Sequence, residues 1–157
     1  MKRKNIFKLL LITAVIGILG AIIIGMYMFN MPHRDVQATK TDYTLTSTQL
    51  ADEYLANNVR ANEKYLQEEG ESKILAVSGK VLSINRDQKN QLVVLLKDPE
   101  ANAGVSCTFM ETTNDHAKTL QIGQNVTIKG VIRSGASFDE DLDMYEDVIM
   151  EKCDVIN

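Results

Sequence analysis

The sequence predicts a mainly β protein, in which an N-terminal transmembrane helix and one amphipathic helix precede a small five-stranded barrel. Three observations support this. Residues 9–29 are uncharged and almost wholly apolar, residues 47–67 show helical periodicity, and apolar residues largely alternate with polar ones from residue 73 onward. An apolar segment of about 20 residues is long enough to cross a bilayer as a helix, and alternation is typical of half-buried strands.

The first 29 residues predict a membrane anchor. Residues 1–8 form a basic tail with Lys2, Arg3, Lys4 and Lys8, and the apolar segment 9–29 follows. That segment is longer than the core of a cleaved signal peptide and lacks an A-x-A-like site, so we interpret it as an uncleaved signal anchor; a cleaved signal peptide is the alternative. The basic residues before it predict a single-pass protein of the inner (cytoplasmic) membrane, with its C-terminal domain in the periplasm or outside.

Small residues recur every fourth position within the apolar segment. Thr13, Gly17, Ala21 and Gly25 would share one face of a helix. Such a stripe lets a second helix approach closely, which predicts self-association in the membrane through Gly17, Ala21 and Gly25. The alternative is that glycine is simply common in membrane helices.

The charge distribution restricts the possible partners of the exported part. Four of the 17 basic residues precede the apolar segment, which leaves 13 against all 21 acidic residues, a net charge of −8. The basic residues are scattered singly among acids. Such a domain repels phosphate backbones and anionic lipid surfaces, so nucleic acid is an unlikely partner.

Residues 30–46 are interpreted as a stalk and residues 47–157 as the folded domain. The stalk contains Pro32 and mixed polar residues without a periodic apolar face, and we expect it to lack order. Residues 46–49, Thr-Ser-Thr-Gln, match a capping box. They start one predicted helix over residues 47–67, which Gly70 ends.

Five strands are predicted after this helix. They comprise residues 73–85, 91–97, 105–109, 126–132 and 148–156. Gly79 in the first strand, followed by Ile84 out of phase, indicates a bend with a bulge. The second strand is continuously apolar over residues 92–96, which predicts burial on both faces. A short helical turn is expected at residues 114–120 and an acidic loop at residues 134–144.

This order of elements is typical of an OB-fold barrel, with five strands, a helical turn between the third and fourth, and a coiled first strand. The third and fifth strands are neighbours in that topology, and they carry Cys107 and Cys153. An oxidising compartment would allow a disulfide between them. Two buried free thiols are the alternative.

Several segments together resemble a known family. They are residues 79–81, 105–109, 122–130 and 153–156 in the strands, with residues 32–36 and 62–65 before the barrel. The set resembles the tRNA-anticodon-domain-like OB-fold family of small bacterial exported or membrane-anchored proteins. The resemblance extends from about residue 31 to the end and implies an OB barrel with a preceding helix. It implies neither a tRNA role nor any site residue.

The side chains available for chemistry do not indicate an enzyme. The histidines are His33, in the stalk, and His116, and no nucleophile with a base is suggested by order or spacing. We therefore predict no catalysis and no cofactor.

An acidic run in the last long loop resembles the start of a calcium loop. Asp139, Asp141 and Asp143 alternate, but Met144 and Met150 stand where such a loop needs glycine and glutamate. By the type of ligand alone, these three aspartates together with Glu140 could form a weak calcium site on the surface. We predict a solvated loop without a metal.

The predicted binding site is a cleft between two loops. Arg86 and Lys89 give it a basic side, and Phe138 and Tyr145, next to acids, give it an acidic and partly apolar side. Such a cleft suits a protein or small ligand better than an oligonucleotide. The sequence thus predicts a membrane-anchored cell-envelope OB-fold binding module. The alternatives are single-stranded nucleic-acid binding and a structural accessory subunit of a membrane complex.

Overall fold

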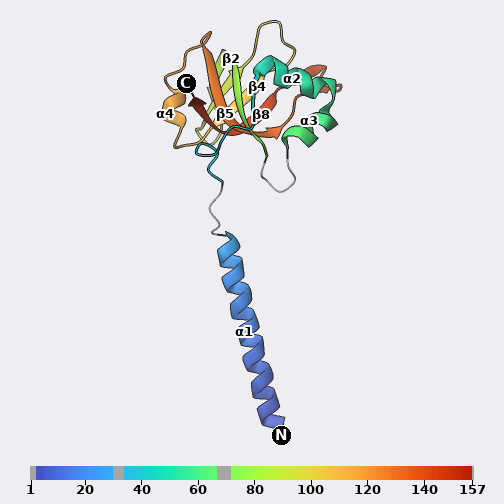
Figure 1. Cartoon of the computed structure of the whole chain (residues 1–157), viewed down its shortest axis with the longest axis vertical. Coiled ribbons are helices and arrows are strands. Elements are labelled where there is room, and N and C mark those ends of the chain that lie inside the picture. Colours follow the sequence, from blue (N-terminus) through green and yellow to red (C-terminus); the bar gives the residue numbers. More distant parts are fainter. Residues whose placement is uncertain (1–2, 30–33, 67–71, 157) are drawn as a thin grey trace. The chain divides into compact units, whose positions relative to one another are not determined.

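The computed structural model describes residues 3–29, 34–66 and 72–156, and the chain forms two compact units, Met1–Arg34 and Asp35–Asn157 (Figure 1). The first unit contains helix α1, Arg3–Phe29. Its segment Ile12–Phe29 is long and apolar enough to cross a membrane, judged by length and composition. No described residue lies within 4 Å of a Cβ atom added at Gly17 or Gly25, and association through this face stays a prediction.

The second unit is a closed five-stranded barrel, which confirms the predicted OB fold (Figure 1). Its strands are β2 Ile74–Arg86, β3 Leu92–Leu96, β4 Val105–Phe109, β5 Asn125–Ser134 and β8 Val148–Ile156. They follow the order β2-β3-β4-β8-β5, and pairing of β2 with β5 closes the barrel. The pair β4–β8 is parallel, and the other barrel pairs are antiparallel.

Alternation along the strands fills the interior of the barrel. In β4, for example, Val105, Cys107 and Phe109 are fully buried. The residues between them face outward and are only half-buried. β3 follows the same pattern, so the expectation that both of its faces are covered is wrong: its alternate residues Val93 and Leu95 stay half-buried.

The long strand β2 bends so that it serves both sides of the barrel. Residues 74–80 pair with β5, residues 81–86 pair with β3, and the register shifts between Val81 and Ser83. This confirms the predicted bulge. A Cβ atom on Gly79 would lie 2.6 Å from Ser47 Oγ, so glycine is needed here for the close approach of the preceding helix.

A short additional strand was not predicted from the sequence. β1, Tyr43–Thr46, pairs in parallel with residues 75–78 of β2. The other edge of these β2 residues pairs with β5. Since β3 pairs with β2 only from residue 81 onward, β1 covers the edge that β3 leaves unpaired. An unpaired edge is a site for unwanted association, and the chain's own segment protects it.

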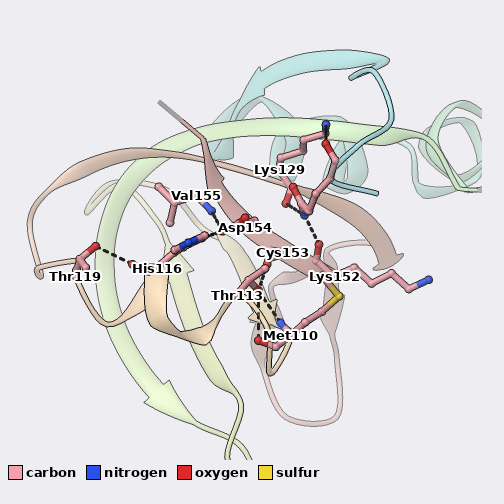
Figure 2. A network of polar contacts seen from close by, with 10 residues as sticks. Met110, Thr113, His116, Thr119, Lys129, Lys152, Cys153, Asp154 and Val155 are labelled. Atoms are coloured by element: carbon pink, nitrogen blue, oxygen red, sulfur yellow. Dashed lines mark hydrogen bonds and ion pairs between the residues drawn. The ribbon is translucent and has the colours of Figure 1, made fainter. Parts of the chain in front are cut away.

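The segment just before β1 is also bound to the barrel, so the structure differs from the expected stalk without order. Val36 is buried, and the side chain of Lys129 on β5 is only 8% exposed. Lys129 Nζ donates to the backbone oxygens of Gln37 at 2.8 Å and Thr39 at 2.5 Å. Gln37 Nε2 donates in turn to the backbone oxygen of Lys152 on β8 at 2.7 Å (Figure 2). We call these contacts the Lys129 clamp.

Two helices stand where the sequence predicts one over residues 47–67. α2 spans Ser47–Ala56 and α3 spans Asn58–Tyr65. Asn57 between them is extended (φ −161°, ψ 92°), and its side chain accepts a hydrogen bond from the backbone N–H of Arg60. An asparagine cap thus replaces the continuous helix. The capping box of Thr46 and Gln49 is confirmed, whereas residue 67 and Gly70 lie outside the described residues.

The two ends of the barrel are closed by different helices (Figure 1). At one end α4, Asn114–Ala117, follows β4, and Asn114 Oδ1 accepts a hydrogen bond from Leu92 N at the start of β3. At the other end the ring of Tyr54 on α2 packs so closely on Gly135 that a Cβ atom there would lie 2.0 Å from it. The expected acidic loop beyond Gly135 contains a hairpin of two strands, β6 Ser137–Asp139 and β7 Met144–Glu146.

Candidate functional site

The structure places the four predicted cleft residues at two opposite ends of the barrel. Arg86 ends β2 and pairs with Leu92 at the start of β3. Phe138 and Tyr145 belong to the segment between β5 and β8, and β8 begins beside the start of β4 and the end of β3. Arg86 and Lys89 therefore do not share a cleft with Phe138 and Tyr145.

The two basic residues belong to a small polar end of the barrel. Arg86 Nη1 donates to the backbone oxygen and to Oδ1 of Asn90, at 3.0 and 3.1 Å, and so braces its own loop. Lys89 lines a hollow of about 360 Å³ with Glu111 and Asn114. The hollow lacks an apolar wall, so it offers little surface to bury against a ligand.

The two aromatic residues border a larger groove. It has a volume of about 730 Å³ and runs between the last turns of α2 and the base of the β6–β7 hairpin. It is lined by Asp52, residues 54–58, Asn102 of the β3–β4 connection, residues 136–138 and Tyr145. We call it the hairpin groove. The sequence identified Phe138 and Tyr145, but α2 as the opposite wall was missed.

The hairpin presents an aromatic pair at the edge of this groove. Phe138 and Tyr145 are partners in the β6–β7 register. Their ring centroids lie 4.8 Å apart with an interplanar angle of 55°. They are 45% and 40% exposed, which is high for large aromatic side chains. Partly exposed, rigid aromatic residues are typical of binding sites, because they bury much surface at little entropic cost.

The opposite wall of the groove includes Tyr54, whose hydroxyl is unsatisfied. The residue is buried, and its OH has no hydrogen-bond partner among the described residues. Loss of solvent raises the pKa of Tyr54 to about 12, and nearby Tyr65 and Glu53 act in the same direction. The phenol is therefore neutral at physiological pH and keeps its proton as a potential donor.

Amide side chains supply polar groups along the groove. Asn58 Nδ2 donates to the backbone oxygen of Ala136 at 3.4 Å, which ties the start of α3 to the hairpin. Asn57 uses its Oδ1 to cap α3, so its NH₂ group is available on the groove side of the junction, as is the side chain of Asn102. Amides of this kind can pair with the backbone of an extended peptide.

The groove is acidic. Asp52 lies among its lining residues, whereas none of the described lining residues is lysine or arginine. A separate charged cluster lies between α2 and α3, where Lys64 Nζ is 2.8 Å from Glu53 Oε2 and Tyr65 OH donates to the same oxygen at 2.8 Å. The hydrogen bond from Lys64 holds the pKa of Glu53 below its ordinary value.

The outer surface of β3 and β4, where many OB domains hold single strands, has a different character. Val93 and Leu95 pair with Thr108 and Ser106, and these four residues face outward. The face thus has neither an aromatic platform for bases nor a basic residue for phosphates on these two strands. Phe109 at the end of β4 is fully buried, so its ring cannot stack on a base.

A second hollow, which was not predicted from the sequence, is lined by residues of the barrel wall. Its volume is about 490 Å³, and β1, β2, β5 and β8 contribute to it. Ser78 Oγ and Thr127 Oγ1 are 2.9 Å apart in its wall, and Lys80 and Asp98 add one charge of each sign. The sequence shows Ser78 and Thr127 only as polar residues in two predicted strands. Their pairing in the wall of this hollow follows from the register between β2 and β5.

The two cysteines are buried on neighbouring strands. Cys107 on β4 and Cys153 on β8 are fully buried free thiols in the structure. Burial raises the pKa of Cys153 well above its usual value, and Cys107 contributes to the shift. The predicted disulfide stays a prediction.

Asp139 among the candidate metal residues and His116 among the acid–base candidates have structural partners. Asp139 Oδ1 accepts hydrogen bonds from the backbone N–H groups of Asp141 and Leu142 within the hairpin turn. The described residues include no group of three or more His, Cys, Asp or Glu arranged to hold a metal ion. His116 Nδ1 lies 2.7 Å from Asp154 Oδ1 (Figure 2), and His33 lies outside the described residues.

Comparisons with known proteins give similarity at the level of family and fold. Over 81% of this chain and 100% of the other, the structure is similar to a lipoprotein from Klebsiella pneumoniae that is proposed to bind nucleic acid, with a TM-score of 0.55 and 18% identity. An asparaginyl-tRNA synthetase from Entamoeba histolytica matches with a TM-score of 0.36 and 20% identity, over 54% of this chain and 21% of that one. A comparison with curated proteins finds no match.

The family of this chain is shown by a match to a family model. The model of the tRNA_anti-like family matches residues 1–140, which is most of the chain. The same family was expected from the strand segments, and the barrel topology agrees with it. The chain belongs to the tRNA_anti-like family.

Proposed function

We propose that this protein is a membrane-anchored binding module of the cell envelope, which holds a segment of a partner protein in the hairpin groove. The exposed Phe138–Tyr145 pair beside a groove of about 730 Å³ carries this proposal. Apolar and amide groups together match what an extended protein segment offers. Ser137 Oγ in the groove donates to Glu146 Oε2 at 2.5 Å, and the two residues are partners in the β6–β7 register, so this contact supports the hairpin beside the groove.

The anchoring part of the proposal is supported by α1 and by charge. Basic residues precede the apolar segment, which favours a cytoplasmic N-terminus and a barrel outside the inner membrane. The Klebsiella neighbour is described as a lipoprotein, a second indication of export or membrane association. To test the orientation, a reporter enzyme that is active only outside the cytoplasm is fused to the C-terminus of the chain. A full-length fusion without reporter activity would contradict the proposed orientation.

Single-stranded nucleic-acid binding is the second candidate, because the Klebsiella neighbour is proposed to bind nucleic acid. The net charge of −8 and the outer face of β3 and β4 favour a protein partner instead. Nucleic-acid binding would appear as a gel shift of a single-stranded oligonucleotide that weakens steeply with salt. The groove proposal expects no shift at low salt.

The proposed function is tested by crosslinking in native membranes, identification of the crosslinked protein by mass spectrometry, and measurement of its affinity for the purified full chain. The double variant Phe138→Ala/Tyr145→Ala should bind about 30-fold more weakly, since truncation of central aromatic residues costs about 2 kcal/mol or more. Ile122→Ala is the control, because Ile122 is 70% exposed at the other end of the barrel. If the unaltered chain, the double variant and the Ile122→Ala control bound the partner with equal affinity, the hairpin groove would be refuted as the binding site.

A role as a structural accessory subunit predicts a different result. In that case Gly17→Ile with Gly25→Ile would disrupt assembly by removing the close-approach face of α1, while the groove variant Phe138→Ala/Tyr145→Ala would assemble normally. Size analysis of the solubilised complex distinguishes these outcomes.

A further inference from the structure

We infer that the hairpin groove selects a basic segment, in which arginine or lysine side chains alternate with apolar ones. The inference rests on the proposed function and adds the chemistry of the partner. The charges of the groove lining and of the hairpin are negative in excess.

The chain around the hairpin has an excess of acidic residues. Between Arg133 and Lys152 the sequence has seven acidic residues and no lysine or arginine. Four of these carboxylates have partners within the chain: Asp139 caps the hairpin turn, Glu146 accepts from Ser137 Oγ at 2.5 Å, Asp147 accepts from Gly104 N at 2.7 Å, and Glu151 forms an ion pair with Arg133.

Four carboxylates are left for a ligand. They are Asp52 inside the groove and Glu140, Asp141 and Asp143 in the hairpin turn. None of the four forms an ion pair with a residue of the described ranges 34–66 and 72–156. Two cations lie beside the groove: Lys97 Nζ donates to the backbone oxygen of Asn102 at 3.0 Å, and Arg60 lines a neighbouring hollow that shares Ala56 and Asn57 with the groove. An acidic partner would be repelled here, and a basic one attracted.

Aromatic rings next to carboxylates make a suitable seat for a cationic side chain. Phe138 and Tyr145 can hold the apolar stem and stack on the charged head group, while the carboxylates neutralise it. The same combination occurs within this chain: Lys64 Nζ lies 4.7 Å from the ring centroid of Tyr65 and 2.8 Å from Glu53 Oε2.

The remaining surface of the groove favours apolar neighbours for the cationic residues. Leu55, Ala56 and Ala136 line it between the polar groups. A purely polar cation would leave this surface exposed to water, whereas a peptide with leucine next to arginine covers it. The amides of Asn57 and Asn102 can pair with the backbone of such a peptide.

The test uses the purified full chain in detergent and three fluorescent nine-residue peptides, measured by fluorescence anisotropy. The first has three arginines separated by leucines and is flanked by glycine and serine; in the second and third, glutamine or glutamate replaces each arginine. We expect the arginine peptide to bind at least tenfold more tightly than the glutamine peptide, and the glutamate peptide most weakly. Asp52→Asn and Asp141→Asn/Asp143→Asn should each weaken only the arginine peptide, by about two- to fivefold, as exposed ion pairs do.

Controls separate this inference from the proposed function. Glu111→Gln removes an exposed charge at the opposite end of the barrel and should change nothing. Phe138→Ala/Tyr145→Ala should abolish the preference for arginine. Equal binding of the three peptides, no binding, or a preference that survives this double variant would each overturn the inference. If the inference fails but Phe138→Ala/Tyr145→Ala no longer captures the crosslinked partner, the hairpin groove remains the proposed binding site, and only its preference for a basic segment is refuted.

Discussion

Replacing Lys129 with methionine should release the segment that leads into the barrel. Lys129 is only 8% exposed, and its Nζ donates to the backbone oxygens of Gln37 at 2.8 Å and Thr39 at 2.5 Å. Methionine keeps an unbranched side chain that can fill the same space, but it has no donor. The variant Lys129→Met thus removes the clamp while the packing of β5 changes little.

The size of the effect follows from the two lost hydrogen bonds. Each bond from a charged donor contributes about 1.5–3 kcal/mol. Part of this is regained, because the variant no longer buries an ammonium group and because Gln37 and Thr39 are only half-buried, so water can reach their carbonyls. We expect a net loss of about 2 kcal/mol, which lowers the Tm of a domain of this size by about 6–10 °C.

Thermal unfolding of the full chain in detergent, followed by the near-UV circular dichroism of its packed tyrosines, measures this loss. Trypsin provides a local readout, since cleavage after Lys40 should accelerate once the clamp is lost. Lys89→Met is the matched control: it removes the same charge from an exposed side chain. If Lys129→Met and Lys89→Met show the same Tm and the same cleavage rate, the clamp does not hold this segment.

Three further predictions concern the helices and the thiols. Tyr54→Phe removes a buried hydroxyl without a described partner and should leave stability unchanged or raise it by about 1 kcal/mol in chemical denaturation; a loss above about 2 kcal/mol would show that the OH is bonded. Because Lys64 lowers the pKa of Glu53 below 4.5, ionised Glu53 stabilises the fold above that pH, and this contribution is lost as the pH falls through the lowered value. Glu53→Gln should therefore flatten the acid limb of the stability curve by under about 1 kcal/mol, and an unchanged limb would contradict the pairing. In an oxidising compartment we expect Cys107 and Cys153 to form a disulfide during folding, before burial makes them unreactive; two free thiols in non-reducing peptide mapping would refute it.

The strands that the sequence predicted best are those with one buried face. β4 and β8 were predicted with the bounds that the structure has, because their alternation is regular over most of the strand. The helix break at Asn57 was missed, since helix-forming residues continue on both sides of it and a single capping side chain decides the outcome. β1 was missed because its stability comes from the free edge of β2, which no local pattern records.

The site was predictable only in part, for the same physical reason. Exposed aromatic residues within an acidic segment marked Phe138 and Tyr145. Their opposite wall, the end of α2, comes from a segment about 80 positions earlier, and only tertiary packing of Tyr54 on Gly135 brings it there. Lys129 gave no signal at all, since a lysine in an alternating strand is normally directed to solvent.

The position from which a partner can be captured tests the groove most directly. A photoreactive benzoylphenylalanine is introduced in place of Phe138, or in place of Ile122 as the control, in the full chain expressed in cells. We expect one protein adduct from position 138 that Tyr145→Ala suppresses, and no such adduct from position 122. The same adduct from both positions, or an adduct to nucleic acid from position 138, would contradict partner binding in the hairpin groove.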